Sequence, residues 1–160
     1  MDVKEAGVVL DSGGEQPGDQ GVPAEVELGG EVGDNPAGRE MGTVCVDLRP
    51  AAQDDPLFVG LSPRICAQAT HQQSVLRTPP GATVLAGNDH DPHHAFRWGQ
   101  AVWGVQFHPE FSAGHMRGYI RARADALARE GADPGALARR VRAAPEARRV
   151  LRRFVGHARR

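Results

Sequence analysis

The chain has 160 residues and a formal net charge of −1 at pH 7, with 40% hydrophobic, 24% charged and 5% aromatic residues. This length fits one domain with a mainly aliphatic core and leaves no room for a second full domain. The charge is unevenly divided, because residues 1–110 carry 16 acidic and 6 basic side chains and residues 111–160 carry 4 acidic and 13 basic ones.

The sequence shows no sign of membrane insertion or export. It contains no run of about 18 apolar residues, and its first residues, Met-Asp-Val-Lys-Glu, lack the basic and apolar regions of a secretory signal. Its two cysteines, Cys45 and Cys66, are too few for a disulfide framework or a four-cysteine zinc site. We therefore expect a cytoplasmic protein without a membrane partner.

The amino-terminal region is rich in acids, glycines and prolines. Residues 1–25 show no sustained period of two or of 3.6 residues, apart from the short apolar run Gly7–Leu10. Too little apolar surface is available there to offset the entropy of the chain, so we expect disorder or loose packing.

The middle of the chain has the texture of short strands separated by turns. Residues of the β-branched and aromatic types favour strands. The predicted strands are Thr43–Leu48, Thr83–Ala86, Ala95–Trp98 and Ala101–Phe107. Together they predict a small sheet.

After Glu110 the apolar period becomes helical. The residues Met116, Ile120, Ala124 and Leu127 form one stripe of a helix that Ser112 would cap and Gly131 would end. Asp133-Pro134 begins a second predicted helix, with Leu137 and Val141 as its apolar residues. A third begins at Pro145-Glu146 and has Val150, Leu151, Phe154 and Val155 on one side. The tail 112–158 is therefore predicted to be helical.

The segment Trp103–Glu110 is the most informative one. As a strand it places Trp103, Val105 and Phe107 on one face, and Gly104, Gln106 and His108 on the other. Pro109 keeps His108 extended and stops the ladder. Glu110 follows two residues later, where its carboxylate could hold one tautomer of the imidazole. The spacing predicts a paired histidine and carboxylate at the end of a strand.

The run Gly104–Glu110 resembles the histidine–glutamate motif of class I glutamine amidotransferases, as found in GMP synthase. Further similarity runs through Leu28–Pro36, Gly38–Thr43 and Thr70–Val75. The resemblance implies an α/β fold: a truncated class I amidotransferase-like domain, with a small mixed sheet plus C-terminal helices. It divides the chain into an unmatched acidic leader, 1–27, and a partial domain, 28–160.

The family hydrolyses the side-chain amide of glutamine to glutamate and ammonia through a Cys-His-Glu triad. The resemblance implies that His108 is the general base and acid and that Glu110 orients it. It also implies that His71 and Ser74 line the glutamine pocket. Glutamine is the implied substrate class, a synthetase or a separately encoded amino-terminal half is the implied partner, and no cofactor is expected.

This sequence departs from the family pattern at the nucleophile. The family's nucleophile lies in a Gly-x-Cys-x-Gly turn upstream of the Leu-Gly-Gly segment, and the residues around Gly18 contain no such turn. Neither Cys45 nor Cys66 has glycine neighbours, so both are predicted to be packed thiols. The chain is therefore expected to be inactive by itself, with no assigned nucleophile. Alternatively, it is one half of a split amidotransferase, or a non-catalytic binding or regulatory protein.

Two weaker signals are interpreted as ordinary surface. The run His90-Asp91-Pro92-His93-His94 has the residue types of a metal site, but Pro92 opposes helical pairing and no other ligand cluster is visible. A surface loop without a metal is favoured. The helical tail is rich in arginine but has no interleaved aromatic residues, so Arg117, Arg121, Arg123 and Arg129 are predicted to cover a solvated helix and a nucleic-acid partner is not expected.

Overall fold

A computed structural model of the protein describes residues 7–10 and 28–159. The strands are β1 Gly7–Leu10, β2 Glu31–Asp34, β3 Glu40–Leu48, β4 Arg64–His71, β5 Gln73–Arg77, β6 Thr83–Gly87, β7 Ala95–Trp98 and β8 Val102–Val105. The helices are α2 Ala113–Ala122, α3 Ala124–Arg129, α4 Pro134–Arg140 and α5 Pro145–Ala158, with a 3-10 helix at Pro50–Asp54. No helix among the described residues is long and apolar enough to cross a membrane.

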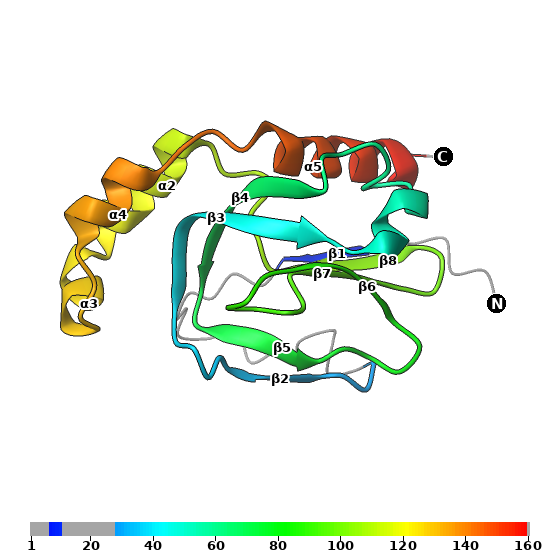
Figure 1. Ribbon diagram of the computed structural model, residues 1–160, viewed down its shortest axis with the longest axis horizontal. Coiled ribbons are helices and arrows are strands. Elements are labelled where there is room, and N and C mark those ends of the chain that lie inside the picture. Colours follow the sequence, from blue (N-terminus) through cyan, green and yellow to red (C-terminus); the bar gives the residue numbers. More distant parts are fainter. Residues whose placement is uncertain (1–6, 11–27, 160) are drawn as a thin grey trace.

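The described strands form two sheets. Six of them pair in the order β1-β8-β7-β6-β3-β4, and β2 pairs with β5 in a separate antiparallel ribbon. Within the larger sheet β1 is parallel to β8, and the remaining pairs are antiparallel. The sheet is therefore mixed, as predicted. Figure 1 shows α5 along one side of this sheet, the β2–β5 ribbon on the other side, and α2, α3 and α4 gathered at one end.

Sequence patterns located some strands and missed others. The predicted strands at Thr43–Leu48, Thr83–Ala86 and Ala95–Trp98 are confirmed as β3, β6 and β7, and the fourth is shortened to Val102–Val105. The strands β2, β4 and β5 were not among those predicted. Gly7–Leu10, within the region expected to be disordered, pairs along β8 as β1, while residues 1–6 and 11–27 of that expectation lie outside the described residues.

The helical tail is confirmed with one change. Ser112 caps α2 by accepting from the backbone N–H of His115, Gly131 has a φ of 85°, and Asp133 caps α4. The first predicted helix is divided at Arg123 into α2 and α3. No glycine or proline marks this break, so the apolar period alone could not have located it.

Two clusters of buried side chains hold these elements together. The larger contains Val46, Ile65 and Trp103 from the sheet, Phe107 from the segment after β8, and Val150 of α5. The smaller consists of Met116, Ile120, Leu127 and Val141. Val155, expected on the apolar side of α5, is 39% exposed. The sheet core thus lies under α5, and α2, α3 and α4 share a core of their own.

Candidate active site

His108 lies just beyond the carboxyl end of β8. Trp103, Val105 and Phe107 are all buried in the sheet core, as the alternation predicted. The opposite face is not solvated, because Gln106 and His108 are also buried, with 2% and 6% exposure. The backbone N–H of His108 donates to Gln68 O at 2.7 Å, which ties this turn to β4. Packing of the apolar face and one backbone hydrogen bond therefore fix the position of the histidine.

The structure brings His108 and Glu110 together. Nδ1 of His108 lies 2.7 Å from Oε1 of Glu110. The imidazole stacks on the ring of Phe111, with 4.5 Å between the ring centroids. Nε2 of His108 is buried and has no hydrogen-bond partner among the described residues. One ring nitrogen is thus held by a carboxylate, and the other has no protein partner among the described residues.

The carboxylate of Glu110 is suited to holding that imidazole. Burial raises the pKa of Glu110, but the hydrogen bond from His108, a backbone hydrogen bond and the charges of His108 and His115 lower it more. The pKa of Glu110 therefore lies below its ordinary value, and the group stays ionised at neutral pH. An ionised carboxylate at Nδ1 orients the ring and stabilises its protonated form.

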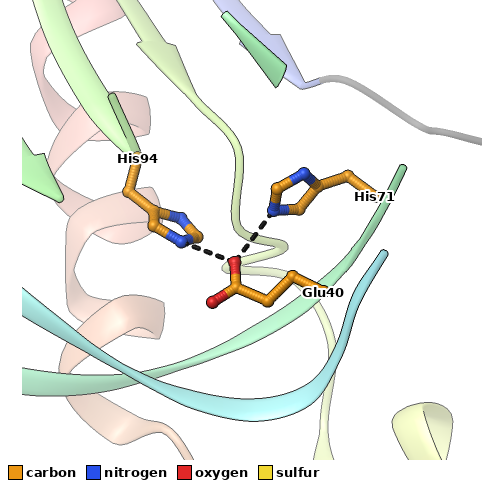
Figure 2. A group of neighbouring side chains, drawn as sticks. All are labelled: Glu40, His71 and His94. Atoms are coloured by element: carbon orange, nitrogen blue, oxygen red, sulfur yellow. Dashed lines mark hydrogen bonds and ion pairs between the residues drawn. The ribbon is translucent and has the colours of Figure 1, made fainter. Parts of the chain in front are cut away.

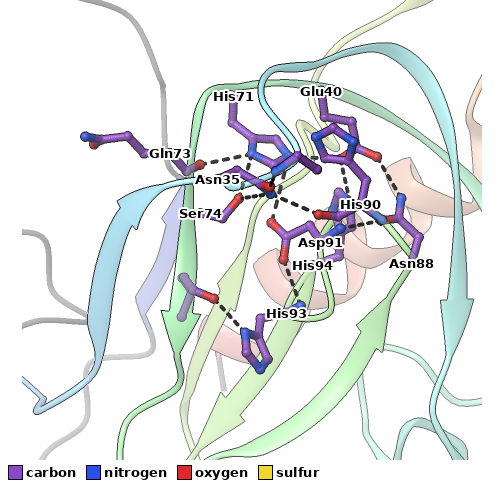
Figure 3. A network of polar contacts seen from close by, with 12 residues as sticks. Asn35, Glu40, His71, Gln73, Ser74, Asn88, His90, Asp91, His93 and His94 are labelled. Carbon is purple, nitrogen blue, oxygen red and sulfur yellow. Dashed lines mark hydrogen bonds and ion pairs between the residues drawn. The ribbon is translucent and has the colours of Figure 1, made fainter.

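His71 and Ser74 belong to a different set of contacts. Both are buried, with 0% and 2% exposure, at the end of β4 and in β5. Nδ1 of His71 lies 3.0 Å from Gln73 O and 3.3 Å from Ser74 Oγ, and Ser74 Oγ accepts from the side chain of Asn35 at 2.8 Å (Figure 3). Ser74 also contributes to the wall of a cavity of about 340 Å³ together with Asn35 and His93. A role of these residues in binding glutamine stays a prediction.

Neither cysteine has the setting of a nucleophile. Cys45 and Cys66 are opposite each other on the antiparallel strands β3 and β4, where the backbone is extended. Cys45 is exposed and Cys66 is partly buried, so the prediction of packed thiols is wrong for Cys45. Burial and the neighbouring Cys45 raise the pKa of the Cys66 thiol, which opposes formation of the reactive thiolate.

The histidine-rich run is not simply a surface loop. His90 and His93 are partly exposed, whereas Asp91 and His94 are fully buried. His94 joins His71 and Glu40 in a buried cluster. Sequence reasoning missed Glu40, because it lies 31 residues before His71 and no local spacing connects them.

The arginines of the helical tail do face solvent, since Arg117, Arg121 and Arg129 are exposed and Arg123 is partly so.

The fold is shared with solved amidotransferase structures. A crystal structure of a glutamine amidotransferase from Thermotoga maritima superposes with a TM-score of 0.62 at 25% sequence identity, covering 82% of this chain and 55% of that one. The sheet and helices described above therefore define an α/β domain of the glutamine amidotransferase type, as the sequence motif predicted.

Sequence comparisons identify the family. The family model described as glutamine amidotransferase class-I matches residues 24–124, and this chain belongs to that family. GMP synthase [glutamine-hydrolyzing] from Porphyromonas gingivalis strain W83 is 40% identical over 73 residues, which cover 45% of this chain and 14% of that protein. A GMP synthase [glutamine-hydrolyzing] subunit from Ignicoccus hospitalis is 36% identical over 83 residues, covering 51% of this chain and 42% of that protein. The chain spans less than half the length of these relatives.

Proposed function

We propose that this chain supplies the histidine and glutamate of an active site that hydrolyses the side-chain amide of glutamine. The observation that carries the proposal is the state of His108: Nδ1 lies 2.7 Å from the carboxylate of Glu110, and Nε2 is buried without a partner among the described residues. The resemblance of Gly104–Glu110 to the family's histidine–glutamate motif supports the same assignment.

The proposed chemistry uses one proton carrier. A cysteine thiolate attacks the amide carbon of glutamine, and protonated His108 gives its proton to the departing nitrogen, which leaves as ammonia. Neutral His108 then takes a proton from water, whose oxygen attacks the thioester and releases glutamate and the thiolate. Glu110 stays ionised and stabilises the imidazolium at each protonated stage.

The nucleophile in this proposal is neither Cys45 nor Cys66. Both lie in extended, directly paired strands rather than in a sharp turn that would raise a thiol toward backbone N–H donors. We therefore propose that the thiolate comes from polypeptide outside these 160 residues, carried on a Gly-x-Cys-x-Gly turn. By itself, the chain is expected not to hydrolyse glutamine.

A synthetase is the proposed consumer of the ammonia. Two relatives reported above are named as glutamine-hydrolysing GMP synthases, and the name of one of them describes it as a subunit, which is one part of an assembly. We propose a partner synthetase for this chain on that basis, and a cytoplasmic location for both.

The test compares the chain alone with a chimera. The chimera joins residues 28–160 to the amino-terminal region of a class I amidotransferase that carries the Gly-x-Cys-x-Gly turn. We expect no release of glutamate or ammonia from the chain alone, release by the chimera, and loss of at least about 100-fold in its kcat when His108 is changed to Ala.

Cysteine variants provide the matched control. The chimera with both Cys45→Ser and Cys66→Ser is expected to keep its activity, because neither thiol reacts. Hydrolysis by the 160-residue chain that His108→Ala abolishes would overturn the assignment of an external nucleophile. An active chimera whose kcat is unchanged by His108→Ala would contradict the role proposed for His108. A folded chimera without activity would favour the alternative of a non-catalytic binding protein.

A further inference from the structure

Four buried side chains with metal-binding chemistry converge at one place away from His108. Glu40 begins β3, His71 ends β4, and Asp91 and His94 come from the connection between β6 and β7. Oε2 of Glu40 lies 3.0 Å from Nε2 of His71 and 2.7 Å from Nε2 of His94 (Figure 2). Oδ2 of Asp91 lies 4.0 Å from Nε2 of His71. Glu40 is 7% exposed, and the other three are 0% exposed.

Some polar atoms of this cluster lack hydrogen bonds. Oδ2 of Asp91 and Nδ1 of His94 are buried without a hydrogen-bond partner among the described residues. Nε2 of His94 is instead in contact with the Glu40 carboxylate at 2.7 Å, and although burial raises the pKa of Glu40, this contact helps to hold it well below its ordinary value. A buried polar atom without a partner costs about 1–3 kcal/mol, so orphaned atoms grouped in one place require an explanation such as a bound ion.

We propose that Glu40, His71, His94 and Asp91 bind one divalent transition-metal ion, of which Zn²⁺ is the best match. Two imidazole nitrogens and two carboxylate oxygens are ligands that Zn²⁺ accepts in a tetrahedral arrangement. A bound metal requires its ligands in the deprotonated form, so the two carboxylates and two imidazoles would contribute a charge of −2, which a divalent cation neutralises. The proposal is independent of the roles proposed for His108 and Glu110, and it assigns His71 to the ion and not to the glutamine pocket.

The distances are compatible with such a site. Zinc bonds of about 2.0 Å in a tetrahedron place neighbouring ligand atoms about 3.3 Å apart. The observed separations of 2.7, 3.0 and 4.0 Å lie on both sides of this value. Ligand atoms of Glu40, His71 and His94 all lie within 4.8 Å of one another, whereas Asp91 is not part of that group and would have to move closer to become the fourth ligand. The near-complete burial predicts a closed, structural site rather than one open to substrate.

Three of the four proposed ligands also form hydrogen bonds through the atoms that would not contact the ion. Nδ1 of His71 lies 3.0 Å from Gln73 O, which favours the tautomer that leaves Nε2 free to bind metal. Asn88 donates to Oε1 of Glu40 at 2.7 Å, and the backbone N–H of His93 donates to Oδ1 of Asp91 at 2.8 Å (Figure 3). Such outer contacts orient the ligands of known metal sites.

The first experiment uses the untagged wild-type chain. After metal-free preparation, the protein is titrated with Zn²⁺ in competition with a chromophoric chelator, and with Co²⁺ while its visible spectrum is recorded. We expect one ion per chain, the intense absorption of four-coordinate Co²⁺, and a Tm that rises on metal addition and falls with EDTA. Absence of stoichiometric Zn²⁺ binding would overturn the proposal and leave the cluster as a buried ion pair.

Variants distinguish the buried cluster from the histidines near the surface. His94→Gln removes a ligand, and we expect its Zn²⁺ affinity to fall at least about 100-fold. The matched control is His90→Gln with His93→Gln, which changes two partly exposed histidines of the same segment and is expected to keep the site. If the control loses binding while folded His94→Gln retains it, the ion is held at the surface and the proposal is wrong. If His94→Gln does not fold, the wild-type Co²⁺ spectrum still decides the coordination number.

Discussion

At the scale of single residues, the main feature is that the two ring nitrogens of His108 have different surroundings. Nδ1 contacts the carboxylate of Glu110, and Nε2 is buried without a hydrogen-bond partner among the described residues. The sequence predicts this pair because Pro109 separates the two residues in a strand-ending turn. It does not predict that Gln106 and His108 would be buried, since alternation alone assigns polar residues to a solvated face.

The lowered pKa of Glu110 predicts how stability depends on pH. A carboxyl group whose pKa is lower in the folded than in the unfolded chain stabilises the fold above its ordinary value of 4.5, and this contribution is lost as the pH falls through the folded-state pKa. We expect the Tm of Glu110→Gln to fall less than the Tm of the wild type as the pH drops below 4.5. Circular dichroism measures both Tm values between about pH 3 and 7, which includes the range of carboxyl titration.

The control for that measurement is Glu31→Gln. Glu31 is an exposed carboxylate on β2 whose ion pair with Arg77 is long, at 3.7 Å. Exposed pairs contribute little to stability, so this variant is expected to follow the wild-type profile. If both variants change the profile equally, the effect belongs to net charge and not to the contact with His108.

At the scale of elements, the strand β8 depends on close contact with β7. Gly104 is the register partner of Phe96, and a Cβ atom at Gly104 would overlap the Phe96 ring. The ring is 2% exposed and has little space to move. Because Gly104 has no side chain, the Phe96 ring can lie where a Cβ atom of residue 104 would otherwise be, and the two strands stay paired.

Gly104→Ala is expected to lower the free energy of unfolding by about 1–3 kcal/mol, because it overpacks this contact. Gly118→Ala is the matched control: Gly118 lies on the exposed side of α2, and no atom lies within 4 Å of the position that a new methyl group would take. That change should raise helix propensity and stabilise by up to about 1 kcal/mol. Urea denaturation measures both, and an unchanged midpoint for Gly104→Ala would contradict the contact with Phe96.

The elements that sequence reasoning missed share a physical cause. The strand β4 carries buried polar residues, Gln68, Thr70 and His71, which hide the apolar alternation of a strand. Glu40 and His71 are direct partners across β3 and β4, although 31 positions apart in the chain. A contact of this kind depends on strand register, which local patterns do not report. The caps at Ser112 and Asp133 were predictable because their signals are local.

At the scale of the whole molecule, hydrogen bonds connect the two cores. The backbone carbonyl of Arg142, between α4 and α5, accepts from the side chain of Gln68 at 2.6 Å, and its N–H donates to Thr43 Oγ1 at 2.9 Å. Arg39 forms a bidentate pair with Glu130, at 2.8 and 3.1 Å. The helices at the end of the molecule are thus attached to β3 and β4 at several points.

These connections predict that both cores unfold in one transition. Ile120→Ala opens a cavity in the smaller core and should cost about 2–5 kcal/mol. If the cores are coupled, the near-ultraviolet signal of the two tryptophans, of which Trp103 lies in the larger core and Trp98 in β7, shifts to lower denaturant together with the far-ultraviolet signal. The exposed Val155→Ala is the control and should change stability by less than about 0.5 kcal/mol. A midpoint of the tryptophan signal that Ile120→Ala leaves unchanged would show that the cores unfold separately.

The strand β1 has a consequence for any polypeptide that completes the site. It runs parallel to β8, with Leu10 opposite Val105. The carboxyl ends of both strands therefore lie at the same end of the sheet, the end after which His108 follows β8. β8 has β7 on one side and β1 on the other. A polypeptide that contributes its own strand would therefore find both sides of β8 already paired. It would have to displace the strand Gly7–Leu10 from β8 or pair with the outer side of that strand. Assembly of a complete catalytic centre by direct pairing with β8 would be an exchange of strands and not a simple addition.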